Sequence, residues 1–251
     1  MVEEKLPSEA FSCAKCDYES NSDFKFCPAC GTKRIALILE KNPFKQRGLI
    51  SLLSYFFLTV LILLLYSVSE DYLVGFFEDM VIFSALFAVI DIVFAFINGR
   101  ESFLFSTKNV KIKPLVLMTV GLVVFGFLVD FFADFLNRSI FEGSPFDGFV
   151  DVYPLITVIG FQCLYPAIFE ELAYRGFVIN NIRSLSNDKT AIIVSGFLFG
   201  LTHLAFVSLI WLVPIGMLFG YLRIRYNTLW YGVIGHFIYN LTVTLIERGI
   251  F

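Results

Sequence analysis

Seven long apolar runs occupy most of this chain, and they constrain its fold more than any other feature. A helix needs about 20 residues to cross roughly 30 Å of hydrocarbon. The runs cover residues 49–68, 73–97, 114–136, 152–174, 191–207, 209–225 and 228–246. We therefore predict an all-α polytopic membrane protein, with about seven transmembrane helices over residues 49–251 and a very tight turn near Ser208.

The composition agrees with this fold class. Hydrophobic residues make up 57% of the 251 residues, 31 residues are Phe, and only 16% are charged, which excludes an ordinary soluble domain. The net charge of −3 and the scattered basic residues exclude nucleic-acid binding. No basic start followed by a short apolar run opens the chain, so we expect no cleaved secretory signal.

Lysine and arginine residues predict the orientation, because positively charged loops stay in the cytoplasm. They gather before the first run and in every second connection after it: Lys41, Lys45 and Arg47; Arg100, Lys108, Lys111 and Lys113; Arg183 and Lys189; Arg223 and Arg225. Only Arg138 and Arg248 lie on the other side. We expect a cytoplasmic N-terminus and an extracytoplasmic C-terminus.

Four cysteines near the N-terminus form two C-x-x-C pairs separated by ten residues: Cys13, Cys16, Cys27 and Cys30. Each pair offers two thiolates at one knuckle, and four thiolates complete a tetrahedral zinc shell. Disulfides are the alternative, and a cytosolic location disfavours them. The pattern predicts a zinc ribbon over residues 1–34 and a linker over 35–48. The ribbon would serve as a small scaffold or bind a protein partner.

Three polar groups interrupt the later apolar runs, and ionisable residues inside a membrane indicate function. The first is Glu170, Glu171 and Arg175, the second is Phe199 and His203, and the third is His236 and Asn240. Either histidine alone has an equally good explanation as an interhelical hydrogen-bond donor. Cys163 is expected to pack between helices, and Asp91, Asp130 and Asp134 to bond to neighbouring helices.

Helical spacing assigns expected roles within these groups. Glu171 and Arg175 are four residues apart with the acid first, which favours an ion pair on one face. Glu170 lies about 100° further round the helix and is free to point elsewhere. His236 and Asn240 share a face and could converge on one oxygen, while the Phe199 ring would shield the site from lipid.

This set of side chains suits the hydrolysis of an amide by an activated water, and it contains no nucleophile. A glutamate in a poorly hydrated site acts as a general base, and neutral histidines and an asparagine stabilise an oxyanion. The sequence has no H-E-x-x-H, no G-x-S-G and no G-x-G-D motif. Counted along the helices, His203 lies deeper than Glu170 and His236, so the fifth helix must begin late or bend for them to meet.

The three blocks resemble the CPBP intramembrane peptidases, the family of type II CAAX prenyl proteases and bacteriocin-processing or bacteriocin-immunity enzymes. The family pattern is E-E-x-x-x-R, then F-x-x-x-H, then H-x-x-x-N, and residues 150–245 carry all three blocks in this order. The N-terminal ribbon is not part of that pattern.

The resemblance implies that Glu170 and His203 activate the attacking water, and that His236 and Asn240 stabilise the oxyanion. Glu171 and Arg175 look like the ion pair that fixes the fourth helix. Whether the membrane site also needs a metal stays open. The substrate would be a peptide or a prenylated peptide that reaches the site from the cytosol or the lipid bilayer.

Two other function classes fit the same residues. A proton-coupled transporter or channel would also place a glutamate, two histidines and an arginine inside the bilayer. A catalytically inactive binding or immunity protein would use the ribbon to hold a partner, and would depend on Cys13 and Cys16 rather than on Glu170.

Overall fold

The computed structural model describes residues 11–13, 15–20, 26–32, 43–69, 76–140 and 152–251. The chain divides into two compact units, Met1–Ser51 and Leu52–Phe251. Residues 35–42 of the predicted linker lie outside the described residues, and residues 43–48 are already helical because α2 begins at Pro43.

The N-terminal unit contains two short antiparallel strands, β1 (Phe11–Ser12) and β2 (Glu19–Ser20), and two turns that each hold a cysteine pair. The two turns repeat the same backbone hydrogen bond, since Asp17 N–H donates to Cys13 O and Gly31 N–H donates to Cys27 O, both at 2.8 Å. Asp17 and Gly31 also share a left-handed backbone, with φ of 53° and 69°. The two turns are therefore structural repeats.

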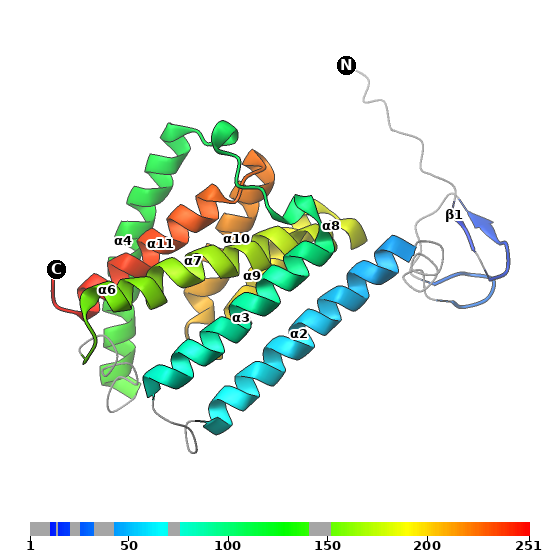
Figure 1. Ribbon diagram of the computed structural model, residues 1–251. Coiled ribbons are helices and arrows are strands. Elements are labelled where there is room, and N and C mark those ends of the chain that lie inside the picture. Colours follow the sequence, from blue (N-terminus) through cyan, green and yellow to red (C-terminus); the bar gives the residue numbers. More distant parts are fainter. Residues whose placement is uncertain (1–10, 14, 21–25, 33–42, 70–75, 141–151) are drawn as a thin grey trace. The chain divides into compact units, whose positions relative to one another are not determined.

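The larger unit is helical, and each predicted apolar run corresponds to a helical segment (Figure 1). The first three helices are α2 (Pro43–Ser69), α3 (Phe76–Asn98) and α4 (Ile112–Ile140). Two 3₁₀ turns, η1 (Arg100–Ser102) and η2 (Thr107–Asn109), join α3 to α4. The last three helices are α9 (Asp188–Leu201), α10 (Leu209–Tyr226) and α11 (Trp230–Glu247).

The fourth run is one long helical segment with two π-helical interruptions. In order it comprises α6 (Leu155–Val158), the π-helix η3 (Ile159–Leu164), α7 (Tyr165–Glu171), the π-helix η4 (Leu172–Val178) and α8 (Ile179–Leu185). π-Helical turns are rare and occur frequently at functional sites. Here one of them directly follows the two adjacent glutamates.

Within the described residues, five helical segments are long and apolar enough to cross a membrane: Lys45–Ser67, Asp79–Asn98, Ile112–Ala133, Leu155–Leu185 and Leu209–Tyr226. The segment α9 has 14 residues and reaches only about 21 Å at 1.5 Å per residue. The predicted run 191–207 therefore ends as a helix at Leu201, and a connection of residues 202–208 replaces the single tight turn expected near Ser208. The count of seven spans stays a prediction.

Close helix packing holds the later helices together. The helix α9 packs on α10, and α11 packs on α4, α7 and η3. A Cβ atom at Gly196 would lie 2.8 Å from Met217 N, and one at Gly216 would lie 2.9 Å from Gly196 Cα. These two glycines therefore face each other and let the backbones of α9 and α10 approach.

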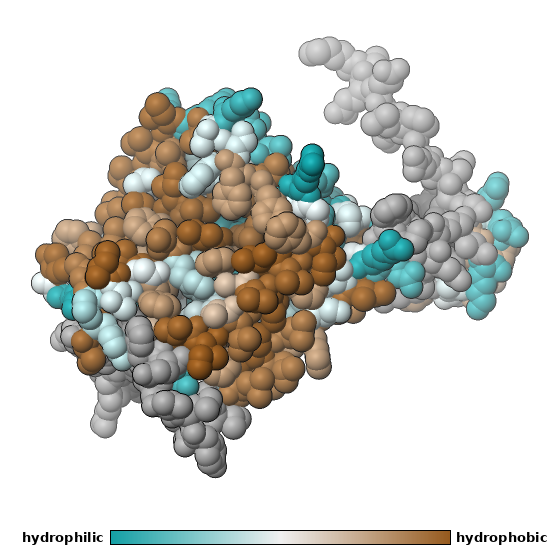
Figure 2. Space-filling model, in the orientation of Figure 1, coloured by the Kyte–Doolittle hydropathy of each residue, from teal (hydrophilic) through white to brown (hydrophobic). Residues whose placement is uncertain are grey.

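Hydrophobic side chains cover much of the visible face of the helical unit (Figure 2). Large residues such as Phe57 on α2, Phe96 on α3 and Phe131 on α4 are 69%, 69% and 75% exposed. Soluble monomers rarely expose apolar surface on this scale. The outward faces of these helices are suited to lipid, as the all-α membrane fold requires.

Candidate active site and metal centre

Glu171 lies at the centre of a fully buried ionic network. Its Oε1 atom is 2.9 Å from Arg175 Nη1, four residues along the same segment, and 3.2 Å from His236 Nδ1 on α11. The exposed fraction of Glu171 is 0%. A buried carboxylate needs such partners, because an isolated charge in an apolar interior is strongly destabilising.

The guanidinium of Arg175 is enclosed by aromatic rings and a backbone carbonyl. Its central carbon lies 4.4 Å from the centre of the Phe199 ring and 5.4 Å from that of Phe219, within the range of cation–π attraction. Its Nη2 atom donates to Gly216 O at 3.1 Å. Arg175 therefore connects the glutamate segment to both α9 and α10.

Glu170 has a different environment although it is adjacent in sequence. It faces a cavity of about 220 Å³ that it shares with His203, and its Oε2 atom lies 4.0 Å from His203 Nε2. The side chains of Glu170 and His203 are 29% and 33% exposed. This separation is too long for a direct hydrogen bond, but one water molecule can hydrogen-bond to both atoms.

His203 reaches the cavity because α9 is short. The helix ends at Leu201, so His203 lies in the connection that follows, and its Nδ1 atom is 2.9 Å from Phe199 O. A carbonyl oxygen can only accept a hydrogen bond, so Nδ1 carries the proton. In the neutral imidazole, Nε2 then has a free lone pair that faces Glu170.

The other predicted residues do not share this cavity lining. His236 is buried beside Glu171, and Asn240 Nδ2 donates to Gln162 O at 2.8 Å. The Phe199 ring has its centre 5.0 Å from that of His203 and 5.6 Å from that of His236, so it contacts both histidines. The structure therefore groups Glu170 with His203, groups His236 with Glu171 and Arg175, and directs the Asn240 amide to a carbonyl of η3.

The first two helices, α2 and α3, also contribute to the site, which the sequence motifs did not predict. The cavity is also lined by Tyr55 and Thr59 of α2 and by Asp91 of α3, and Tyr55 OH donates to Asp91 Oδ1 at 2.9 Å. Asp91 thus has the hydrogen bond to a neighbouring helix that was expected for it. The sequence signal for a role of α3 in the site was Asp91 itself, an acid in the middle of an apolar helix.

Two further expectations concern single residues. Cys163 is buried and packs with its Sγ atom 3.6 Å from Thr244 Oγ1. The side chain of Asp134 lies outside the described residues.

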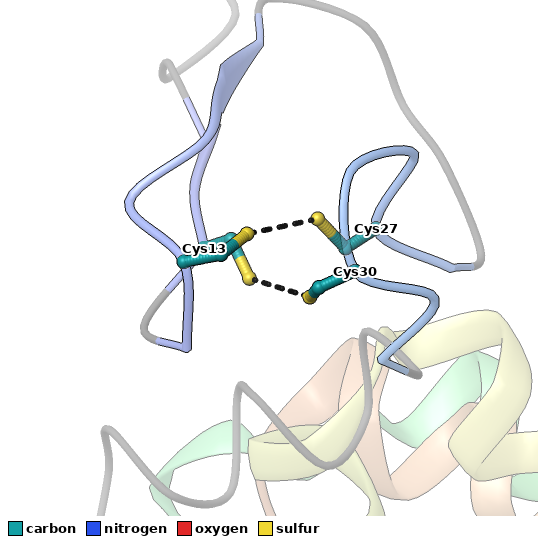
Figure 3. A group of neighbouring side chains, drawn as sticks. Cys13, Cys27 and Cys30 are labelled. Atoms are coloured by element: carbon teal, nitrogen blue, oxygen red, sulfur yellow. Dashed lines mark hydrogen bonds between the residues drawn. The ribbon is translucent and has the colours of Figure 1, made fainter.

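The four N-terminal cysteines converge, with all four sulfur atoms within 4.8 Å of one another (Figure 3). The Cys13–Cys30 and Cys16–Cys27 sulfur pairs are each 3.7 Å apart. A disulfide would require about 2.05 Å, whereas thiolates at about 2.3 Å from a tetrahedral metal lie about 3.8 Å apart. The residues therefore fit a metal ion, and among the described residues no other group of three or more His, Cys, Asp and Glu side chains lies close enough together to hold one.

Thr32 prepares one of these ligands. Its hydroxyl lies 3.2 Å from Cys30 Sγ. This side-chain hydrogen bond, together with one from the Thr32 backbone, lowers the pKa of the Cys30 thiol to about 6. The thiolate is the form that binds metal, so this cysteine is ready for coordination at neutral pH.

The helices, their apolar outer faces and the polar site between them define a polytopic membrane protein with an intramembrane acid and histidine site. Residues 153–242, which carry all three motifs, match the family model of the Rce1-like type II CAAX prenyl endopeptidases. The family is one of proteases, and the match supports an intramembrane protease. Comparisons with curated proteins and with solved structures gave no match.

Proposed function

We propose that this protein is an intramembrane endopeptidase that hydrolyses a peptide bond with a water molecule activated by Glu170 and His203. The observation that carries the proposal is the 4.0 Å separation of Glu170 Oε2 and His203 Nε2 across a cavity that both line. Both atoms accept hydrogen bonds, so one water would donate both of its protons to them. Its oxygen lone pairs would then be free to attack a carbonyl carbon.

The hydrolysis needs no covalent intermediate with the protein. The water oxygen adds to the carbonyl carbon of the scissile bond while Glu170 or His203 takes one of its protons. The carbon–nitrogen bond then breaks, and the same proton passes to the leaving nitrogen. The products are a new carboxylic acid and a new amine, and transfer of the second water proton from the acid to the amine gives a carboxylate and an ammonium group.

His236 and Asn240 are proposed to stabilise the oxyanion, as the resemblance implies. Glu171 accepts from His236 Nδ1, so Nε2 can donate to an oxyanion only when the ring carries both protons. Asn240 uses one amide hydrogen on Gln162 O and keeps the second. Glu171 and Arg175 would hold His236 in place, which makes them positioning residues.

Several other assignments belong to this proposal. The substrate would be a peptide or prenylated peptide that enters from the cytosol or the lipid. The four cysteines would bind zinc, whose preferred tetrahedral thiolate site they match. The ribbon would occupy residues 1–34 and dock a protein partner or act as a scaffold, and the N-terminus would be cytoplasmic and the C-terminus extracytoplasmic.

Replacing Glu170 tests the proposal. We expect Glu170→Gln to lower the turnover of a peptide substrate by about 10²- to 10⁴-fold, the usual contribution of a general base. The matched control is Glu101→Gln, an exposed acid in η1 that does not line the cavity. A comparison of the membrane proteome with active and Glu170→Gln protein would identify the substrate. Cleavage that persists in a folded Glu170→Gln protein contradicts the proposal.

A further inference from the structure

Five residues with hydroxyl groups line the cavity beside Glu170, and each hydroxyl already donates its proton in a hydrogen bond to another protein atom. Tyr55 OH donates to Asp91 Oδ1, Thr59 Oγ1 to Tyr55 O, Tyr165 OH to Ser84 O and Thr202 Oγ1 to Phe199 O, at 2.9, 2.9, 2.5 and 3.0 Å. Because the Thr202 proton is already committed to that carbonyl, Tyr174 OH is the donor in its 2.7 Å hydrogen bond to Thr202 Oγ1. No hydroxyl proton is left to donate into the cavity.

The remaining polar groups on the cavity wall are acceptors. Glu170 Oε2 is buried and has no hydrogen-bond partner among the described residues. His203 donates from Nδ1 to Phe199 O, which leaves the Nε2 lone pair toward Glu170. Asp91 is 5% exposed, lines the same cavity, and receives the Tyr55 proton on one oxygen. When Asp91 is ionised, its other oxygen is an acceptor.

With Asp91 ionised, the described side chains on the cavity wall supply acceptors and no donors, and such a cavity selects its ligand by hydrogen-bond chemistry. It matches groups that bring their own protons, such as water, peptide N–H groups and ammonium ions. Binding of a carboxylate is disfavoured, because its oxygens would face only other acceptors and groups of like charge. In peptide hydrolysis the two products differ in this respect, since one gains an amine and the other gains a carboxylate.

We propose that this cavity is the subsite for the amine side of the scissile bond, and that Asp91 of α3 is its specificity-determining residue. This inference rests on the proposed function, which supplies the two products. Asp91 accepts a hydrogen bond from the N–H donors of the bound fragment, and Tyr55 of α2 orients the carboxylate. Both residues lie outside residues 153–242, so the first two helices contribute a recognition element of their own to the family segment.

The direct test measures binding without catalysis. The full-length protein in detergent at pH 7 is titrated with n-butylammonium chloride and, separately, with sodium butyrate, and thermal unfolding is followed. We expect n-butylammonium to raise the unfolding temperature and butyrate to leave it unchanged. Asp91→Asn should weaken n-butylammonium binding by about tenfold or more, since the amide keeps the Tyr55 hydrogen bond but brings a donor into the cavity.

Two variants separate recognition from packing. Asp79→Asn is the matched control, because Asp79 is also 5% exposed and on α3 but does not line the cavity. It should bind n-butylammonium as the unmodified protein does. Tyr55→Phe keeps the ring that packs on Phe94 and Phe177 but loses the hydroxyl that orients Asp91, so it should weaken n-butylammonium binding in a protein that still folds. Stabilisation by butyrate, stabilisation by neither compound, or equal effects in Asp91→Asn and Asp79→Asn each overturn the proposal.

The second test uses the reaction itself. Once a cleaved peptide is known, the product with the newly formed amino terminus should inhibit competitively. The product with the newly formed carboxyl terminus should not. In Asp91→Asn the KM should rise about tenfold while kcat changes less, because the lost contact is one of binding. If the unmodified protein cleaves no peptide, the proposed function fails while the n-butylammonium result stands. If cleavage proceeds but the carboxylate product is the inhibitor, the subsite assignment fails alone.

Discussion

Two adjacent glutamates show how much a single residue's role depends on the side of the helix that it occupies. Glu171 is completely buried and is held by Arg175 and His236, whereas Glu170 is 29% exposed and faces a cavity. Successive residues on a helix point about 100° apart, so one segment can supply both a buried, ion-paired acid and the acid that is proposed to activate water. The two carboxylates are not interchangeable, and a Glu171→Gln variant cannot serve as a neutral control for Glu170→Gln.

Gly232 makes the Glu171 network possible. A Cβ atom at Gly232 of α11 would overlap the Glu171 Oε2 atom, so any larger residue must push the carboxylate away from His236. We expect Gly232→Ala to lower the free energy of unfolding by about 1–3 kcal/mol, the usual cost of overpacking. Chemical unfolding in detergent micelles measures this change.

The control for Gly232 is Gly160→Ala in η3, where an added Cβ would meet no atom within 4 Å. This variant should unfold at the same denaturant concentration as the unmodified protein. If Gly232→Ala is equally stable, Glu171 can move without loss, and the close contact with α11 has no role in holding His236.

At the scale of elements, the sequence predicted the helical segments and the pairing of Glu171 with Arg175, because both follow from local spacing. It did not predict where α9 ends. Apolar residues continue past Leu201 through Leu204, Phe206 and Val207, so the hydrophobic run reads as one helix to residue 207. The early end of α9 brings His203 to Glu170, whereas the sequence-based argument required α9 to begin late or to bend.

Two side-chain contacts between helices could not be predicted from the sequence either. The hydrogen bond of His236 with Glu171 and the donation of Asn240 to Gln162 depend on the register of α11 against the fourth segment. Gln162 lies in the π-helix η3, which shifts the faces of α7, the helix that follows it and carries Glu171. A regular 3.6-residue period cannot account for this shift, so the sequence alone could not predict these two contacts, and the convergence of His236 and Asn240 on one oxygen stays a prediction.

The packing of α9 on α10 gives a prediction at this scale. Gly196→Ala would place a Cβ atom 2.8 Å from Met217 N and 3.1 Å from Val213 O, which are backbone atoms that cannot rotate away. We expect the two helices to separate and the free energy of unfolding to fall by about 1–3 kcal/mol or more. The proposed peptidase activity should fall as well, because Phe199 lies on the same helix as Gly196 and His203 lies in the connection directly after that helix.

Gly121→Ala on α4 provides the comparison for Gly196, since its added Cβ would meet nothing within 4 Å. Both changes add one methyl group to a glycine in a helix, so the difference between them reports the close approach alone. Equal unfolding free energies for the two variants would show that α9 and α10 do not depend on this contact.

At the scale of the whole molecule, the two compact units are stabilised by different means. The unit Leu52–Phe251 has several clusters of buried apolar side chains and an internal ionic network. Within the described residues of Met1–Ser51, the buried cluster consists of Cys13 and Cys27 with Cys30 packed against them. If the four cysteines hold a metal ion, as proposed, a unit whose core is its cysteines would depend on that ion for its folding free energy.

Metal removal should therefore unfold one unit and spare the other. We expect a strong chelator to increase backbone hydrogen exchange over residues 11–32, since metal binding supplies about 10–16 kcal/mol in comparable cysteine sites. The amides of Asp17 and Gly31, which close the two cysteine turns, should lose protection first, while exchange in η4 and α11 should not change. Cys16→Ser should reproduce the effect without chelator and Cys163→Ser should not, because Cys163 packs beside Thr244 and is not one of the four clustered cysteines. Protection of residues 11–32 that survives complete removal of the metal, verified by metal analysis, would show that the two turns fold without an ion.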